Sequence, residues 1–165
     1  MENNKWCAIL NPYAGEKLLN KDLKKIHECI KELELDIDLV WTQYKGHAAK
    51  IAQECVEKGC LNLVVFGGDG TLNEVVNGVF SSSIENKSDA CIALVPYGTG
   101  NDWGRFWGIT RNLKDSLSLL KTGKKKLVDV GKATLSGNTS YFLNAIGMGF
   151  DAEVIKVVSA IKNHL

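Results

Sequence analysis

The sequence lacks the features that mark several large classes of protein. No apolar run approaches the roughly 20 residues of a membrane-spanning helix, and the polar start MENNKW does not resemble a signal peptide. The 20 Lys and Arg residues almost balance the 19 Asp and Glu residues, and a net charge of +1 argues against a general nucleic-acid binder. A Walker A sequence is missing, which excludes a conventional P-loop NTPase. We therefore expect a cytoplasmic globular protein.

Cysteine is scattered, and no two cysteines form a C-x-x-C pair. An odd number of cysteines within strand and helix patterns favours buried free thiols in a reducing cytosol over a disulfide framework. The spacing also argues against a metal cluster of Cys and His. The five residues are Cys7, Cys29, Cys55, Cys60 and Cys91.

Apolar runs that suit buried strands alternate with segments of helical periodicity along most of the chain. The strand patterns cover residues 6–10, 37–41, 63–66 and 91–95, and the helical patterns cover 21–35, 47–59, a segment opening at 71, and 113–120. Strands that alternate with helices form a parallel sheet with right-handed crossovers. The sequence therefore predicts a doubly wound, mostly parallel, three-layer α/β domain.

The most informative stretch runs from Leu63 to Gly78 and reads LVVFGGDGTLNEVVNG. A short buried strand, a Gly-rich turn and a helix start form the arrangement in which backbone N–H groups and a helix dipole hold a phosphate. Thr71 and Glu74 fit a capping box, which predicts that Thr71 is the N-cap of the helix. Glu74 is equally consistent with a ligand contact and with the capping role alone.

Asp69 is the exceptional residue of this turn, because a carboxylate repels a bound phosphate. We expect Asp69 to orient Mg²⁺ or to accept the proton of a hydroxyl group. The alternative is a tight turn closed by an Asx-type hydrogen bond.

Polar or Gly-rich clusters follow all four predicted strands. They cover residues 11–15, 42–47, 67–71 and 98–102. In open α/β sheets, ligands bind beyond the carboxyl ends of the strands. The four clusters therefore predict one convergent site.

The character of the sequence changes after Lys121. The run Lys124-Lys125-Lys126 is either a solvated strand entry or a contact with an anionic membrane surface. Residues 127–135 and 140–145 then predict two strands of a hairpin around the turn 136–138, with Asp129 as a buried carboxylate in the first, and a helical tail covers 152–165. We expect residues 1–130 to form a catalytic lobe and 131–165 to begin a second, β-rich lobe. Because such a short lobe cannot bury a core of its own, we expect a truncated chain that self-associates through residues after Gly131.

With these motifs together, the chain resembles the bacterial diacylglycerol kinase-like lipid kinases, which are relatives of sphingosine kinases and, more distantly, of NAD kinases and phosphofructokinases. The GGDGT element is shared by all these relatives, whereas Gly98-Thr99-x-Asn101-Asp102 points to the lipid-kinase branch. The resemblance covers the whole chain, in order. Its motifs lie at residues 11–15, 42–48, 67–78, 96–102, 128–131 and 144–152.

The resemblance implies an ATP- and Mg²⁺-dependent kinase that phosphorylates the hydroxyl of a diacylglycerol-type lipid in phospholipid biosynthesis, with peripheral membrane contact as an open option. Asp69 and Asp102 would be the catalytic carboxylates, and Asp129 would help to organise Mg²⁺ and water. The residues implied in nucleotide binding are Asn11, Pro12, Tyr13, Ala14, Gly15, Lys17, Thr42, Gly67, Gly68, Gly70, Thr71, Leu72, Asn73, Glu74, Gly98, Thr99 and Asn101. The chain departs from the family at Ala14, where Ser is common, and at Glu16-Lys17, where Lys directly follows the glycine.

Two other functions remain open: a kinase of the same superfamily acting on a soluble alcohol such as NAD, and an ATP-binding lobe that is inactive without a second lobe. Several single residues also have an alternative role that is structural and not functional. Asn101 and Asp102 could merely cap a short helix, and His47 could hold its own loop. Trp103, Phe106 and Trp107 could be core residues or could line the access of a lipid.

Overall fold

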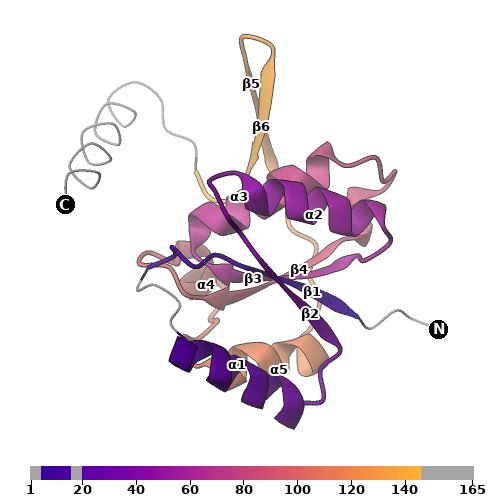
Figure 1. Cartoon of the computed structure of the whole chain (residues 1–165). Coiled ribbons are helices and arrows are strands. Elements are labelled where there is room, and N and C mark those ends of the chain that lie inside the picture. The colour runs from indigo at the N-terminus through magenta and orange to yellow at the C-terminus, as the bar shows by residue number, and fades with distance from the viewer. Residues whose placement is uncertain (1–4, 16–19, 146–165) are drawn as a thin grey trace.

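A parallel four-stranded sheet forms the centre of the molecule in the computed structural model, which describes residues 5–15 and 20–145 (Figure 1). The strands are β1 (Trp6–Leu10), β2 (Ile37–Trp41), β3 (Asn62–Gly67) and β4 (Cys91–Pro96), in the order β2-β1-β3-β4. All three strand pairs are parallel. Each strand lies within one residue of its predicted bounds, and the predicted doubly wound α/β fold is confirmed.

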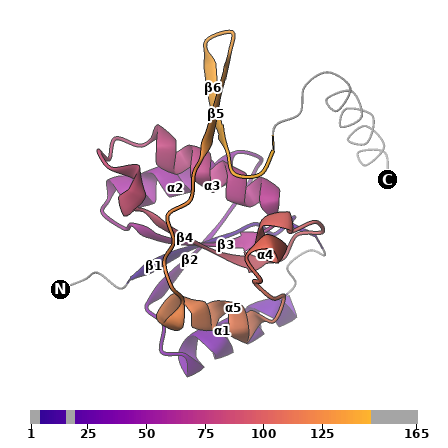
Figure 2. The ribbon, with the colours of Figure 1, turned by 180° about the vertical axis from the view of Figure 1, so that it is seen from behind.

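Two helices cover each face of the sheet. Helices α2 (His47–Glu57) and α3 (Asp69–Ser81) lie on one face, and α1 (Asn20–Glu32) and α5 (Leu113–Thr122) lie on the other (Figures 1 and 2). A hydrophobic core lies on each face of the sheet, and alternate residues of β1 contribute to the two cores. Cys7 and Ile9 pack towards α2 and α3, whereas Ala8 and Leu10 pack towards α1 and α5. The remaining short helices are the 3₁₀ helix η1 (Lys87–Asp89) and α4 (Asp102–Phe106).

Backbone geometry ends two of the helices before their predicted bounds. Helix α1 stops at Glu32 because Glu34 adopts a left-handed conformation with φ of 47°. Helix α2 stops at Glu57, and Gly59 follows with φ of 87°, the conformation in which a helix C-terminus commonly closes.

The start of α3 corrects the predicted capping box. The helix begins at Asp69, and its N-cap is Gly68, which makes no side-chain capping bond. The Thr71 side chain instead accepts a hydrogen bond from the Asn11 amide at 2.9 Å, and the Glu74 carboxylate accepts the Gly46 N–H at 3.0 Å. The capping box was wrong because both side chains find partners in other loops of the sheet edge.

An antiparallel hairpin follows the parallel sheet and begins a second, β-rich part. Its strands are β5 (Gly131–Leu135) and β6 (Asn138–Phe142). Ser136 and Gly137 both have positive φ, of 50° and 80°, which suits a two-residue turn of the type that matches strand twist. The predicted hairpin is confirmed, although residues 127–130 and 143–145 do not belong to a strand, and Asn138, predicted in the turn, is the first residue of β6. The predicted helical tail and the motif at 149–152 lie outside the described residues.

Contacts with α3 fix the hairpin to the α/β domain. The Asn77 side chain donates to the Tyr141 carbonyl at 2.8 Å and accepts the Tyr141 N–H at 2.9 Å. The Phe80 and Tyr141 rings lie 4.4 Å apart. Strand β6 therefore lies against the helix whose first turn forms the Gly-rich site. In residues 5–15 and 20–145, no helix is long and apolar enough to cross a membrane.

Candidate active site

A cleft of about 540 Å³ lies at the carboxyl ends of β1, β3 and β4. The loops after these strands supply most of its wall, as the four polar clusters of the sequence predicted. The lining residues are Asn11, Ala14, Gly15, Lys45, Gly68, Asp69, Gly70, Thr71, Asn73, Glu74, Gly98, Thr99 and Gly100. Three predicted clusters therefore meet directly, and the fourth contributes through Lys45.

Glycine allows these loops to approach each other backbone to backbone. A Cβ atom on Gly98 would lie 2.4 Å from the Cα of Gly68, and one on Gly68 would lie 2.9 Å from the Cα of Gly98. Gly15 has φ of 55°, and a Cβ there would lie 2.1 Å from the carbonyl oxygen of Tyr97. The glycines thus bring the loops after β1, β3 and β4 together at one point.

The first turn of α3 faces the cleft, since residues 68–71 line it. The first N–H groups of a helix have no partner within the helix, and the helix dipole adds partial positive charge there. Asn11 fixes this turn through its bond to Thr71, and its side-chain oxygen accepts the Tyr13 N–H at 2.9 Å. The arrangement offers backbone donors to an anion.

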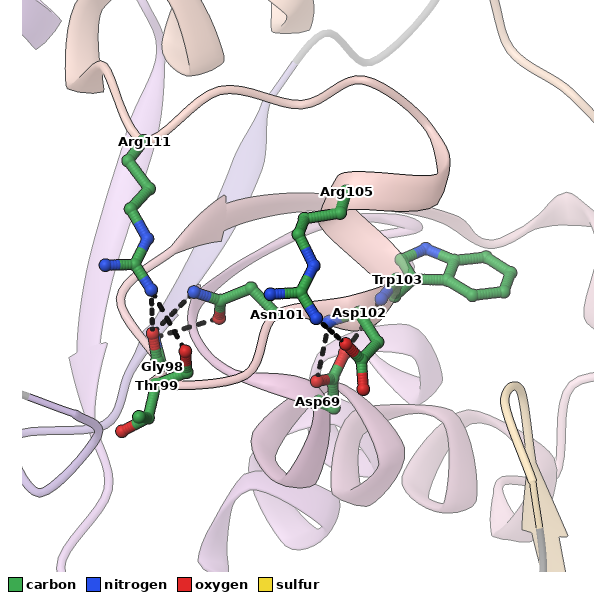
Figure 3. Close-up of polar contacts among 8 residues, drawn as sticks. All are labelled: Asp69, Gly98, Thr99, Asn101, Asp102, Trp103, Arg105 and Arg111. Atoms are coloured by element: carbon green, nitrogen blue, oxygen red, sulfur yellow. Dashed lines mark hydrogen bonds and ion pairs between the residues drawn. The ribbon is translucent and has the colours of Figure 1, made fainter.

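Asp69 lies at the centre of the site and organises its neighbour, α4. Its two carboxylate oxygens accept the N–H groups of Asp102 at 2.9 Å and Trp103 at 3.0 Å (Figure 3). Asp69 therefore caps α4 across the cleft instead of closing its own turn. Asn101 occupies the N-cap position of α4, as the capping alternative expected, but its side chain makes no capping hydrogen bond, and Asp102 is the first residue of the helix.

Asn101 stabilises the loop after β4 through a hydrogen bond to its backbone. It is 3% exposed, has φ of 52°, and its side-chain oxygen accepts the Gly98 N–H at 3.0 Å. Arg111 donates to the carbonyl oxygens of Gly98 at 3.0 Å and Thr99 at 3.1 Å (Figure 3). Sequence reasoning missed Arg111, because nothing in its local pattern links it to a loop more than ten residues earlier.

Lys45 supplies a cation to the cleft and was also missed. Its loop is held by the bond from Gly46 to Glu74 and by His47, whose ring nitrogen accepts the Gln43 N–H at 3.0 Å. The structure therefore supports the loop-holding alternative for His47. The predicted cluster at 42–47 was the available signal, but Thr42 was chosen from it, and Thr42 is buried away from the cleft.

Several other predicted residues do not line the cleft. Asp102 is exposed and pairs with Arg105. Asp129 is exposed and lies outside any strand, so the prediction of a buried carboxylate was wrong. The reason is that residues 123–129 run along the surface, where Leu127 is 86% exposed. Lys17 lies outside the described residues. The others are Pro12 and Tyr13 in the first loop, Gly67 at the end of β3, the buried Asn101, and Leu72, which lines a second pocket.

The second pocket, of about 250 Å³, adjoins the cleft beneath the end of β6. It shares Asp69 and Asn73 with the cleft, and the rest of its wall is Leu72 and residues 140–145. Asp69 thus lines both the polar, glycine-rich cleft and a pocket formed in part by Tyr141, Phe142 and Leu143.

The donor set suits Mg²⁺ only in combination with a phosphate. In the part of the chain that the structure describes, no three His, Cys, Asp or Glu side chains come together as a metal site. Mg²⁺ is usually held by one or two carboxylates together with substrate phosphates, and Asp69 is a carboxylate in the cleft. The residues therefore fit an ion that arrives with a nucleotide.

The fold and the position of the cleft define a class: a doubly wound α/β domain with its ligand site beyond the carboxyl ends of parallel strands. The family model described as the diacylglycerol kinase catalytic domain matches residues 5–133. The chain belongs to this family of kinases, as its motifs predicted.

Individual relatives agree with this assignment. The chain is 31% identical over 146 residues to the diacylglycerol kinase of Staphylococcus carnosus, covering 88% of this chain and 45% of that protein. It is 30% identical over 141 residues to the Staphylococcus aureus diacylglycerol kinase, covering 86% of this chain and 42% of that protein. A diacylglycerol kinase crystal structure from Bacillus anthracis matches with a TM-score of 0.70 at 32% identity, covering 87% of this chain and 47% of that chain. The chain therefore spans less than half the length of these relatives.

Proposed function

We propose that this chain is the nucleotide-binding lobe of an ATP-dependent lipid kinase, which transfers the γ-phosphoryl group to the hydroxyl of a diacylglycerol-type acceptor in phospholipid biosynthesis. One observation carries the proposal: Asp69 and Asn73 line both the glycine-rich cleft and the partly apolar pocket beside it. Nucleotide phosphates in the cleft and an acceptor hydroxyl in the pocket would meet at the Asp69 carboxylate.

The proposed roles follow from the contacts of each group. Backbone N–H groups of the glycine loops and the first turn of α3 hold the phosphates, and Lys45 neutralises part of their charge. The bonds to α4 fix the Asp69 carboxylate, which orients the acceptor hydroxyl and accepts its proton. Asp69 would hold a Mg²⁺ ion that arrives with the nucleotide, and that ion would supply neutralisation of the phosphate charge. Asp102 remains the predicted second carboxylate.

Two alternatives concern the acceptor and the turnover. A soluble alcohol such as NAD would need a polar acceptor pocket, whereas Tyr141, Phe142 and Leu143 favour a lipid. The other alternative is a chain that binds ATP without turning it over.

Calorimetry with ATP and Mg²⁺, with a phosphorylation assay on the same sample, tests the proposal. Diacylglycerol in mixed micelles and NAD serve as competing acceptors. Binding of ATP with phosphate transfer to diacylglycerol alone supports the lipid kinase. Transfer to NAD supports the first alternative, and binding without transfer supports the second. Absence of binding by a chain that circular dichroism shows to be folded would refute the phosphate-binding role.

We also propose that the chain is cytoplasmic and makes peripheral contact with an anionic lipid surface. Phe106 is 77% exposed, and its ring contacts Trp107 in an edge-on arrangement at the end of α4. The Lys126 amine lies 5.0 Å from the Trp107 ring, and Lys124 and Lys125 are exposed beside it. Aromatic rings with adjacent lysines suit the interface of an anionic membrane. Trp103, in contrast, packs against the core.

Self-association through residues after Gly131 remains a prediction. Strands β5 and β6 form a two-stranded sheet, and Leu135 in it is highly exposed. Open strand edges can pair with another chain. Sedimentation of a strictly monomeric chain would contradict this prediction.

A further inference from the structure

Two free cysteines from different layers of the fold lie side by side. Cys7 is in β1 and Cys55 is in α2, and their sulfur atoms are 2.9 Å apart. The two residues are separated by 48 positions in the sequence. Cys7 is 4% exposed in the core, whereas Cys55 is half-buried at its edge.

The other thiols have different surroundings. Cys60 lies near two backbone carbonyl oxygens, of Lys5 at 3.8 Å and Asn62 at 3.7 Å. Cys29, in α1, and Cys91, in β4, pack on the opposite face of the sheet. Among the described cysteines, Cys7 and Cys55 are therefore the pair whose sulfur atoms are in direct contact.

The contact also shifts the pKa values of the two thiols in opposite directions. The hydrogen bond with Cys7 lowers the pKa of Cys55. The same hydrogen bond, together with burial, raises the pKa of Cys7. Because the thiolate is the nucleophile, the lowered pKa favours Cys55 over Cys7 as the first sulfur to react with an oxidant, and Cys7 lies in contact with it as a resolving partner.

We propose that Cys7 and Cys55 form an oxidation site that a hydroperoxide converts into a disulfide between β1 and α2. The Cys55 thiolate attacks a peroxide oxygen, the O–O bond breaks, and Cys55 becomes a sulfenic acid while hydroxide leaves. The Cys7 sulfur then attacks the Cys55 sulfur, the S–O bond breaks, and water leaves with the Cys7 proton. Two thiols are oxidised and one hydrogen peroxide is reduced to two waters. The sulfur atoms need to approach by only about 1 Å to reach the S–S bond length.

The disulfide would link two elements that lead to the cleft. Strand β1 ends next to Asn11, which bonds to Thr71, and α2 begins after Gly46, which bonds to Glu74. A cross-link over a loop of this length restricts the unfolded chain strongly. For a chain of this size we expect the melting temperature to rise by on the order of 10 °C on oxidation and to fall again with dithiothreitol.

The test uses the full reduced chain treated with hydrogen peroxide. We expect titratable thiols to fall from the five of the reduced chain to three, and peptide mapping to link Cys7 with Cys55. The Cys55→Ser variant should keep all its remaining thiols free, whereas Cys91→Ser, the matched control on the other face, should still form the link. Circular dichroism checks that both variants fold.

Three results would overturn the proposal. The first is wild-type chain that retains five free thiols after the oxidant is consumed. The second is a link from Cys55 to Cys60 in place of Cys7. The third is accumulation of sulfinic acid on Cys55 while Cys7 stays reduced.

Discussion

Gly98→Ala tests whether backbone contact between the glycine loops builds the cleft. The added Cβ would lie 2.4 Å from the Cα of Gly68 and 2.7 Å from the Asn101 side-chain oxygen, so the loops after β3 and β4 have to separate. Overpacking of this kind costs about 1–3 kcal/mol. For a chain of this size, the melting temperature should fall by roughly 5 °C.

The same separation displaces the backbone donors on both sides of the cleft. We expect this displacement to cost at least about 1.4 kcal/mol of binding free energy, which corresponds to a tenfold change in affinity. ATP–Mg²⁺ binding to Gly98→Ala should therefore weaken by about tenfold or more. Calorimetric titration gives the affinity, and a thermal melt followed by circular dichroism gives the stability of the same sample.

Gly70→Ala is the matched control, because Gly70 lines the same cleft and a Cβ there has no heavy atom within 4 Å. Its melting temperature should stay at or above the wild-type value, since Ala is the better helix former. A methyl group in the open cleft should still weaken ATP binding. Equal stability and equal affinity of Gly98→Ala and the wild type would refute the reasoning about loop contact. Wild-type affinity in Gly70→Ala would refute phosphate binding at this turn.

Four further changes probe separate contacts. Asp69→Asn should weaken the Mg²⁺-dependent part of ATP binding, lose about 1 kcal/mol of stability through the weakened cap of α4, and abolish any phosphate transfer; measurable transfer would contradict its catalytic role. Lys45→Met should lower the affinity for ATP and make that affinity less dependent on salt, as measured by calorimetry. Lys50 is an exposed lysine of α2, and Lys50→Met should change neither the affinity nor its salt dependence. Gly78→Ala should lower the melting temperature by several degrees, because its Cβ would lie 2.0 Å from a carbonyl oxygen of α2; an unchanged melt would refute this close packing. Trp107→Ser should reduce sedimentation with anionic phosphatidylglycerol vesicles and leave the weak binding to phosphatidylcholine unchanged; equal loss on both would argue against a charged interface.

The sequence alone predicted the elements and the edge of the sheet that carries the site. Strand and helix patterns depend on the period of apolar residues along a short segment, so β1 and β2 are predicted to the residue. The hairpin turn, predicted at 136–138 and formed by Ser136 and Gly137, is likewise a local property. Parallel connectivity then requires that the clusters after β1, β3 and β4 meet at one edge, and they line one cleft.

Only the tertiary structure decided which partner each polar side chain has. Thr71 and Glu74 have the spacing of a capping box, yet both bond to other loops, and Asp69 caps a helix more than 30 residues away. Arg111 carries no local signal, and the cluster at 42–47 does not single out Lys45, because the contacts of both residues are set by the folding of distant segments onto one edge. Backbone periodicity is fixed by neighbours in the chain, whereas a hydrogen bond or charge pair is fixed by distance in space. The sequence therefore located the site, and the fold assigned its contacts.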